Sequence, residues 1–264
     1  MTQLYDCENR MKFQEMTSPQ IAAVDRENTL VIVPIAAVEQ HGPHLPTGTD
    51  NIICTAIASA VESRCNSSVL LTPTTWYGAS AHHLRLGATL SSELDTFIAT
   101  LCGLTTNLLD DGFRRILLLN GHGGNVDPLQ VALRKMQPIC DNALLAGGSY
   151  WATAGEIIRD AMEGDHKFVG HACEFETSMI MHLRPELVDT EKLADAGELV
   201  TDRIEGLFVS RDMKHRTQQG CTGRPDLATA EKGSKLFEGI VDRVEIAVQK
   251  LLEQPLGEVY GDFF

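Results

Sequence analysis

The sequence is poor in positive charge and has no long apolar run. Its 264 residues include 22 Lys and Arg against 36 Asp and Glu, which gives a formal net charge of −14. A nucleic-acid-binding surface needs clustered basic residues to replace the counterions of phosphate, and no basic run here is longer than a pair such as Arg114–Arg115. No apolar stretch approaches the roughly 20 residues of a membrane-spanning helix. We therefore expect neither a nucleic acid nor a membrane as a partner.

Cysteine pairs at metal-binding or redox spacing are also absent. The seven cysteines form no CxxC motif, which disfavours a disulfide framework or a zinc ribbon and is typical of reduced thiols. The N-terminal segment MTQLYDCENRMKF carries acidic and polar residues where a signal peptide needs an apolar core. These features predict a cytoplasmic protein. The length allows one or two domains, and the lack of a linker or repeat favours a single domain over residues 1–264.

Segments of strand character alternate with segments of helix length. The run LVIVPIAAV at 30–38 is continuously apolar, which is typical of a strand covered on both faces. Further strands are predicted at 69–72, 115–120 and 143–149. Helices are predicted at 18–26, 51–64, 94–110, 127–136, 174–184 and 228–252. This alternation predicts an α/β fold with a mainly parallel sheet and helices on both of its faces.

The first of two polar clusters that follow predicted strands contains Glu39, His41 and Asp50. Open parallel sheets form their sites beyond the carboxyl ends of strands. Glu39 and His41 are two residues apart, so their side chains can point the same way, and the Gly- and Pro-rich turn after them can bring Asp50 back. Two carboxylates and an imidazole suit Zn²⁺, Mn²⁺ or Fe²⁺. The alternative is that Asp50 only caps the next helix and that the other two are exposed loop residues.

The second cluster is NGHGGN at 120–125, whose glycines let the backbone approach a ligand closely around His122. A phosphate-binding loop is a competing interpretation, but no Lys follows and the GxGxxG spacing is absent. A plain turn with an incidental histidine is the other interpretation.

A third polar segment, HACEFETS at 171–178, opens a predicted helix. Glu174 and Ser178 are one turn apart on one helix face, whereas Glu176 points elsewhere. Taken alone, the segment is better explained as an acidic first turn favoured by the helix dipole.

Together the three segments resemble the creatininase (creatinine amidohydrolase) family. The matching motifs are EQHGPHLP at 39–46 with Thr49-Asp50, NGHGGN at 120–125, and HAxExETS at 171–178, in the family's order and separation. The resemblance extends from about residue 13 to residue 252. It implies a three-layer αβα fold, a homo-oligomer (a hexamer in creatininase itself) and a centre of two divalent metal ions, Zn²⁺ or Mn²⁺ in most members and Fe²⁺ as another option.

By position, the resemblance implies that Glu39 and His122 bind one metal, that His41 binds the other, and that Asp50 bridges both. Creatininase completes its second site with a glutamate two residues after the motif histidine, where this chain has Gly124.

Two acidic residues are candidates for the ligand that Gly124 does not supply. We take Glu174 as the replacement, with Glu176 as the alternative ligand or as a catalytic residue beside the metals.

The resemblance also implies roles for residues around the metals. His171 matches the histidine that shuttles protons in creatininase, and Trp151 matches a tryptophan that lines its pocket. Ser80 and His83 belong to a segment that commonly reads Ser-x-Glu-His in the family, and here His82 replaces the acid. We expect Trp151, His83 and Ser80 to bind substrate. For His82, His83 and Arg85, the alternative is that they are solvated loop residues.

The expected function is that of a metal-dependent hydrolase acting on a non-peptide C–N bond. Two metals activate water for attack on a small amide, formamide, lactam or related carbonyl, while His171 moves a proton. The departures at His82 and Gly124 argue against creatinine itself as the substrate. Because the family also includes hydrolases of oxidised inositols, a metal-dependent hydrolase or isomerase of an oxidised inositol or sugar is the alternative. A non-catalytic metal-binding protein is the third possibility.

Overall fold

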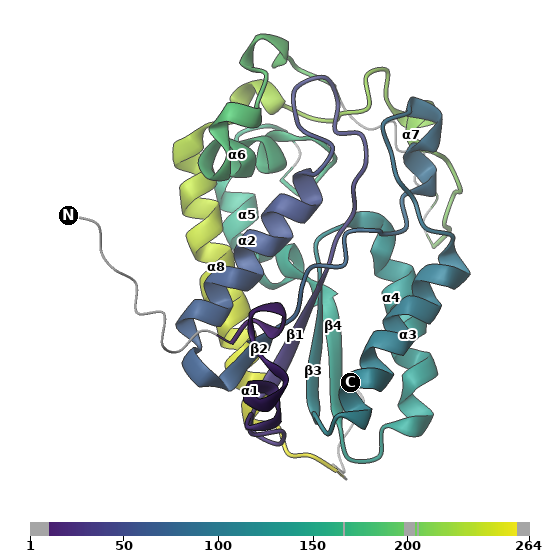
Figure 1. Ribbon diagram of the computed structural model, residues 1–264. Helices are drawn as coiled ribbons and strands as arrows, with labels where there is room; N and C mark the ends of the chain where they lie inside the picture. The colour runs from purple at the N-terminus through teal and green to yellow at the C-terminus, as the bar shows by residue number, and fades with distance from the viewer. Residues whose placement is uncertain (1–10, 166, 198–203, 205, 258–264) are drawn as a thin grey trace, which may run out of the picture.

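A parallel β-sheet forms the centre of the computed structural model, which describes residues 11–165, 167–197, 204 and 206–257 (Figure 1). Its strands lie in the order β2-β1-β3-β4, and all three pairings are parallel. Their bounds are β1 (Leu30–Ile35), β2 (Val69–Leu71), β3 (Arg115–Asn120) and β4 (Leu144–Ser149). Ile35, Asn120 and Ser149 lie in register at the carboxyl ends of their strands. The loops that follow β1, β3 and β4 therefore leave the sheet at the same edge.

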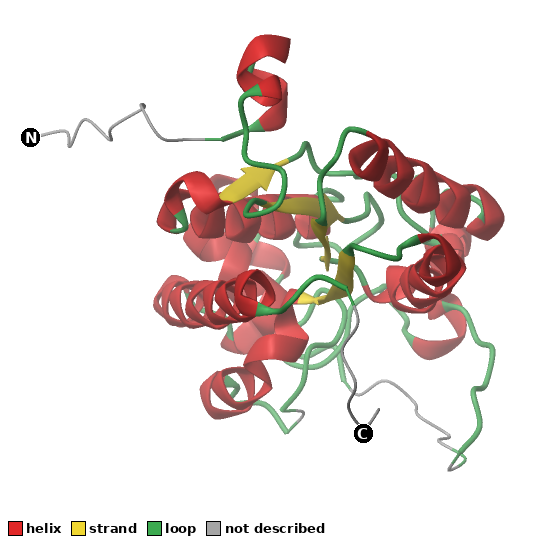
Figure 2. Ribbon diagram, turned by 90° about the horizontal axis from the view of Figure 1, so that it is seen from below, coloured by secondary structure: helices red, strands yellow, loops and turns green. Residues whose placement is uncertain are grey.

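Helices cover both faces of this sheet, as the two ribbon views show (Figures 1 and 2). Helices α3 and α4 lie on one face, and α2, α5, α6 and α8 lie on the other, while α1 and α7 are short. The bounds are α1 (Ser18–Ala22), α2 (Thr49–Arg64), α3 (Leu94–Asp110), α4 (Val126–Met136), α5 (Gly155–Ala161), α6 (Glu174–Leu183), α7 (Met213–Arg216) and α8 (Ala230–Glu253). Among the described residues, no helix combines the length and the apolar character that crossing a bilayer requires.

Successive side chains of β1 pack into two separate cores. Leu30 and Ile32 join the core under α2 and α8, whereas Val31 and Val33 join the core under α3 and α4. This division follows because neighbouring residues of a strand point to opposite faces. A strand that is buried on both faces needs a continuous apolar sequence, which explains the run at 30–38. The predicted three-layer αβα fold is thus confirmed.

Several predicted bounds need correction. Strand β1 ends at Ile35 rather than at residue 38, because the Ala36 amide donates to the Thr75 carbonyl, 2.9 Å away, instead of continuing the ladder. Helix α1 ends at Ala22 rather than near residue 26, since the Asp25 side chain accepts from the amides of Glu27 and Asn28 and forms a turn. Helices α5 and α7 are not among those that the sequence predicts.

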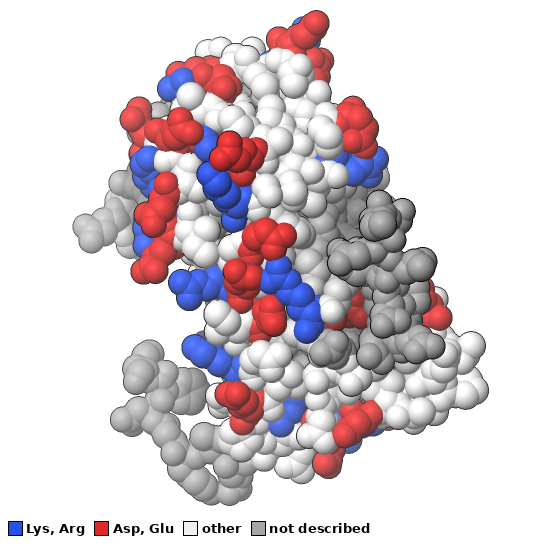
Figure 3. Space-filling model, turned by 90° about the vertical axis from the view of Figure 1, so that its left-hand side faces the viewer, with Lys and Arg blue, Asp and Glu red and all other residues white. Residues whose placement is uncertain are grey.

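Acidic and basic side chains are interspersed on the face of the molecule on the side of α8 (Figure 3). Arg64 of α2 pairs there with Glu238, Asp242 and Glu245 of α8. Exposed pairs of this kind contribute at most about 1 kcal/mol each. The apolar stripe of α8 under these pairs is therefore the main attachment of this helix.

A buried ion pair joins α6 to α8. Glu174, the first residue of α6, accepts from the Lys232 ammonium of α8 and from the backbone amides of Glu163 and Gly164, each 3.0 Å away. The side chains of Glu174 and Lys232 are only 5% and 7% exposed. This carboxylate is therefore already satisfied by protein donors.

The buried pair predicts a large stability difference between two neighbouring lysines of α8. Lys232→Ala leaves the Glu174 carboxylate buried without its cation, and we expect a loss of about 3 kcal/mol in the free energy of unfolding. Lys235 pairs with Glu231 at the exposed surface, so Lys235→Ala should cost at most about 0.5 kcal/mol. Urea unfolding of both variants measures this, and equal losses would contradict the assignment.

Candidate metal centre

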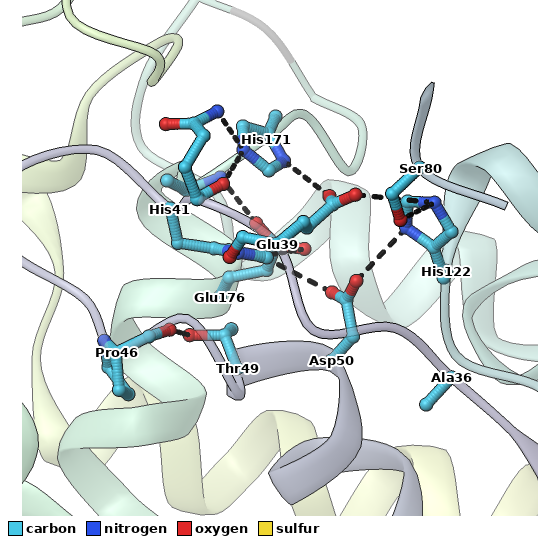
Figure 4. A network of polar contacts seen from close by, with 12 residues as sticks. Ala36, Glu39, His41, Pro46, Thr49, Asp50, Ser80, His122, His171 and Glu176 are labelled. Carbon is cyan, nitrogen blue, oxygen red and sulfur yellow. Dashed lines mark hydrogen bonds and ion pairs between the residues drawn. The ribbon is translucent and has the colours of Figure 1, made fainter. Parts of the chain in front are cut away.

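Five ionisable side chains converge at the carboxyl edge of the sheet (Figure 4). Glu39 and His41 come from the loop after β1, and His122 from the loop after β3. Asp50 lies in the first turn of α2, and Glu176 in the first turn of α6. All five are buried, with exposed fractions between 1% and 7%. Charged groups rarely share so dry a site unless a metal or a partner compensates them.

Asp50 lies between the two histidines of the cluster. Its Oδ1 is 3.2 Å from Nε2 of His41, and its Oδ2 is 3.0 Å from Nδ1 of His122. Helix α2 is preceded by Gly48 at its N-cap and has no side-chain cap, so Asp50 is not simply a capping residue. Its carboxylate offers one oxygen to each side, as a bridging ligand must.

Glu39 and Glu176 flank this central group on opposite sides. Oε2 of Glu39 is 3.4 Å from Nε2 of His122, and Oε1 of Glu176 is 3.9 Å from Nε2 of His41. The ligand atoms of Glu39, His41 and Asp50 lie within 4.8 Å of one another, and so do those of His41, His171 and Glu176. Two further sets, Glu39 with His83 and His171 and Glu39 with His82 and His122, meet the same limit, so the described residues contain four overlapping sets of possible metal ligands.

Three atoms of the cluster are buried without a hydrogen-bond partner: Glu39 Oε2, His41 Nε2 and Asp50 Oδ2. An unpaired polar atom in the interior costs about 1–3 kcal/mol. Each of these atoms lies close to another acid or imidazole but lacks the geometry of a hydrogen bond with it. They are oxygen and nitrogen donors of the kind that divalent ions bind, so the residues present fit a divalent-metal centre.

The pKa shifts of the cluster also fit a divalent-metal centre. Burial raises the pKa of Glu39 to about 7, although His122 opposes this shift. Burial by itself would lower the pKa of His122, but the carboxylates of Glu39 and Asp50 raise it to about 9. Asp50 likewise outweighs burial and raises the pKa of His41 well above its ordinary value. Without a metal, protons on these imidazoles supply the positive charge that the acids need.

Two further histidines face Glu39 from the other side. Nε2 of His83 is 3.2 Å and Nδ1 of His171 is 3.5 Å from Oε1 of Glu39. Burial lowers the pKa of His83 and of His171 well below the usual value, so both rings are neutral near pH 7.

Gln40 orients both of these rings. Its side-chain amide donates to Nδ1 of His83, 2.7 Å away. Its backbone carbonyl lies 2.8 Å and its side-chain amide nitrogen 3.0 Å from Nε2 of His171. Because the two amide hydrogens point to His83 and to the Gly220 carbonyl, and because a carbonyl only accepts, we assign the proton of His171 to Nε2. The lone pair of Nδ1 in His171 therefore faces the cluster, where it can take a proton or bind a metal. Gln40 lies inside the EQHG motif, yet the sequence analysis assigned it no role.

The predicted substrate-binding residues lie around the same site. Oγ of Ser80 is buried 3.3 Å from Nε2 of His122. Trp151 and His83 line a cavity of about 680 Å³ that also contains Glu39, Asp50, His122, His171 and Glu176. Arg85 does not line this cavity, because its exposed side chain pairs with Asp212.

Glu174 is the one predicted site residue that the structure does not bring to the cluster. Its carboxylate turns towards Lys232 of α8, as described above, and it lines a different cavity with Phe168 and Arg224. Glu174 and Glu176 point to different sides of α6, as helix geometry requires. The prediction that Glu174 replaces the missing ligand is therefore wrong, and Glu176 is the acid that faces His41.

The surroundings of Gly124 explain why this chain cannot carry a glutamate ligand at position 124. A Cβ atom there would lie 2.1 Å from the Ala79 carbonyl oxygen, 2.5 Å from Nε2 of His122 and 2.7 Å from Cε1 of His82. The ring of His82 stacks on that of His122, with centroids 5.7 Å apart. His82 thus occupies the space that a side chain at position 124 would need, and no motif spacing connects these two residues in sequence.

Comparison with known proteins agrees with this geometry. The sequence profile of the family described as creatinine amidohydrolase matches residues 14–248. The chain belongs to the creatininase family.

The family relatives have different activities. A mycofactocin precursor peptide peptidase of Mycobacterium tuberculosis is 30% identical over 257 residues, which cover 92% of this chain and 94% of that protein. A 3-dehydro-scyllo-inosose hydrolase of Thermotoga maritima is 28% identical over 273 residues, which cover 94% of this chain and 86% of that protein. A crystal structure of creatininase superposes with a TM-score of 0.79 at 25% identity, covering 93% of this chain and 99% of that one. Family membership is therefore clear, whereas substrate identity differs among the relatives.

The contacts of Gly124 predict the result of adding a single methyl group. Gly124→Ala must displace the Ala79 backbone or the ring of His122, so we expect its affinity for Mn²⁺ or Zn²⁺ to fall at least about tenfold. Gly123→Ala is the matched control, since a Cβ atom there meets nothing within 4 Å. Calorimetric titration with each metal compares the two variants, and equal affinities would contradict the predicted clash.

The raised pKa of His122 predicts proton release on metal binding. The metal-free protein holds a proton on His122 below about pH 9, and a metal must displace it. The apparent affinity should therefore rise with pH, by about tenfold per unit for each displaced proton, and level off above pH 9. Calorimetry in two buffers of different protonation enthalpy counts the released protons at neutral pH. A pH-independent affinity without proton release would show that the imidazoles are not ligands.

Proposed function

We propose that this chain is a metal-dependent hydrolase with a centre of two divalent metal ions. The observation that carries this proposal is the position of Asp50, whose two oxygens face different imidazoles across a buried cluster with unpaired donors. Acids and imidazoles without metals would leave these polar atoms unsatisfied. Related creatininase structures are described as "Creatininase Mn" and as "Zn-Zn type", which supports Mn²⁺ or Zn²⁺ as the ions.

Each metal would have its own set of protein ligands. Glu39, Asp50 and His122 would hold the first ion. His41, Asp50 and Glu176 would hold the second, with Glu176 as the ligand that Gly124 does not provide. Three protein ligands per ion leave coordination positions for water and substrate, as catalytic sites require.

The bound ions would supply a Lewis acid for a carbonyl oxygen and lower the pKa of water to about 7. The protein residues supply the rest. His171 presents the lone pair of Nδ1 to the cluster, so it can accept a proton there and return it to the leaving atom. The backbone carbonyl of Gln40 accepts from Nε2 of His171, which holds the ring in place and keeps the proton on Nε2. Trp151 lines the cavity and would position the substrate there. Ser80 does not line the cavity, and its buried hydroxyl would act through its contact with His122.

The substrate class that we propose is an amide, including formamides, lactams and peptides. Our expectation of a non-peptide C–N bond finds no support, because a relative at 30% identity is named as a peptide peptidase. An oxidised inositol is the second candidate substrate. The relative from Thermotoga maritima, which matches 94% of this chain, is named as an inosose hydrolase. A cytoplasmic homo-oligomer stays a prediction, and so does a single domain over residues 1–264.

Two substitutions separate metal binding from proton transfer. His171→Ala should keep both ions and lose about 10²–10⁴-fold in turnover, because it removes only the acid–base group. Asp50→Ala should lose the ions as well, since it removes the shared ligand. His182→Ala, on the same helix as Glu176 but packed against Phe237, is the control. The measurements are elemental analysis and a screen of formamides, lactams, dipeptides and keto-inositols.

Two outcomes would contradict the residue assignments in this proposal. Full turnover in His171→Ala would remove the assignment of the acid–base group. Retention of both ions in Asp50→Ala would remove the bridging role of Asp50.

A further inference from the structure

The cavity over the metal centre has a positively charged wall that the proposed chemistry does not use. Residues 208 and 210–213 and Arg216 of α7 line the same cavity as Glu39, Asp50 and His122. The family motifs at 39–50, 120–125 and 171–178 contain none of these wall residues. This wall is therefore a feature of the substrate side of the cavity.

Arg216 stands out on this wall because its charge is not compensated. The side chain is half-buried, and it has no hydrogen-bond or ion-pair partner in the part of the chain that the structure describes. The neighbouring acid, Asp212, is already engaged: its Oδ2 accepts from Arg85 at 2.8 Å, and its Oδ1 lies 2.9 Å from Nδ1 of His215. A half-buried guanidinium without an anion has lost part of its hydration and gained no partner.

The charge of Arg216 acts on the same space as the metal centre. Burial, together with the positive charges of His122 and Arg216, lowers the pKa of His82 to about 4. His82 stacks on His122, which belongs to the centre. An anionic group in the cavity can therefore reach Arg216 while another part of the same molecule reaches the metals.

The chemistry of the wall favours a carboxylate over a phosphate. A guanidinium offers a planar fork of N–H donors that matches two oxygens of a carboxylate or of a phosphate, so the rest of the lining must discriminate between them. The described lining contains no lysine and no glycine-rich phosphate loop with the Walker spacing. A cavity of about 680 Å³ also holds more than a single small ring, since pockets of about 300–1,000 Å³ hold drug-sized ligands.

We infer that the substrate is an amide that carries a carboxylate, and that Arg216 binds this carboxylate while the metal centre holds the amide carbonyl. The inference rests on the proposed function, because it needs a metal centre at the other end of the cavity. Arg216 is a specificity residue in this scheme, since it contacts a part of the substrate that does not react.

Hydroxamates test both ends of the cavity, because the hydroxamate group chelates metals. The probes are the succinic, glutaric and adipic monohydroxamates, each compared with the analogue in which a carboxamide replaces the free carboxylate. Calorimetry on the Zn²⁺- or Mn²⁺-loaded protein at about 0.15 M salt, where long-range charge effects are screened, gives the two affinities. We expect the carboxylate of the best-fitting length to bind at least about tenfold more tightly than its carboxamide, as a charged hydrogen bond predicts.

Two variants assign this preference to a residue. Arg216→Gln should reduce the ratio of carboxylate to carboxamide affinity to about one while the carboxamide affinity stays constant. Lys214→Gln removes the same charge from the same short helix, but Lys214 is exposed and does not line the cavity, so the ratio should persist.

Each outcome has a separate meaning. If the unmodified protein binds each carboxylate hydroxamate and its carboxamide analogue with equal affinity, the role of Arg216 is overturned and the metal centre still stands. A preference that survives in Arg216→Gln would also overturn it. Failure of every hydroxamate to bind would overturn the proposed metal centre and this inference with it.

Discussion

The contact on which the site depends is that of the Asp50 carboxylate with His41 on one side and His122 on the other. These two histidines are in loops that leave neighbouring strands, and Asp50 is in the first turn of the helix that follows one of them. The group therefore fixes two loops and a helix relative to one another. Since the Asp50 side chain is only 4% exposed, water cannot replace its partners at low cost.

The sheet makes this contact possible. In-register parallel strands β1 and β3 end side by side at Ile35 and Asn120, so their loops start a few ångströms apart. Gly121 then lets the second loop approach α2, because a Cβ atom there would lie 2.5 Å from Cβ of Cys54. Asn120 donates to the His122 carbonyl at 2.7 Å and to Ser149 of β4 at 2.9 Å, which ties the loop to the next strand. The cluster is thus held by the rigid end of the sheet.

The sequence predicted this part of the structure well because the signals were local. Continuous apolar runs identified the buried strands, and the motifs after them contained the side chains that converge. The assignment of Glu174 failed for a physical reason: a buried acid in the first turn of a helix has the same sequence signal whether it faces a metal or a lysine. The partner, Lys232, is 58 residues away in sequence and no pattern connects the two. The role of His82 beside Gly124 was equally invisible, since it depends on a steric exclusion between two loops.

The cavity wall shows where sequence reasoning ends altogether. Arg216 belongs to no motif and lies on a four-residue helix that the sequence analysis did not predict. The proposed role of Arg216 depends on the absence of a partner among the described residues, which is a property of the folded chain and has no signal in the sequence. In this chain the residue proposed to recognise the substrate thus lies on a short helix beside the cavity, whereas the proposed metal ligands lie at the carboxyl edge of the sheet.

Anomalous diffraction from crystals of the Mn²⁺- or Zn²⁺-loaded protein tests the central claim most directly. The account predicts two metal peaks per chain on either side of the Asp50 carboxylate, one bound by Glu39 and His122 and the other by His41 and Glu176. A single peak, or a second peak beside Glu174 and Lys232, would contradict it.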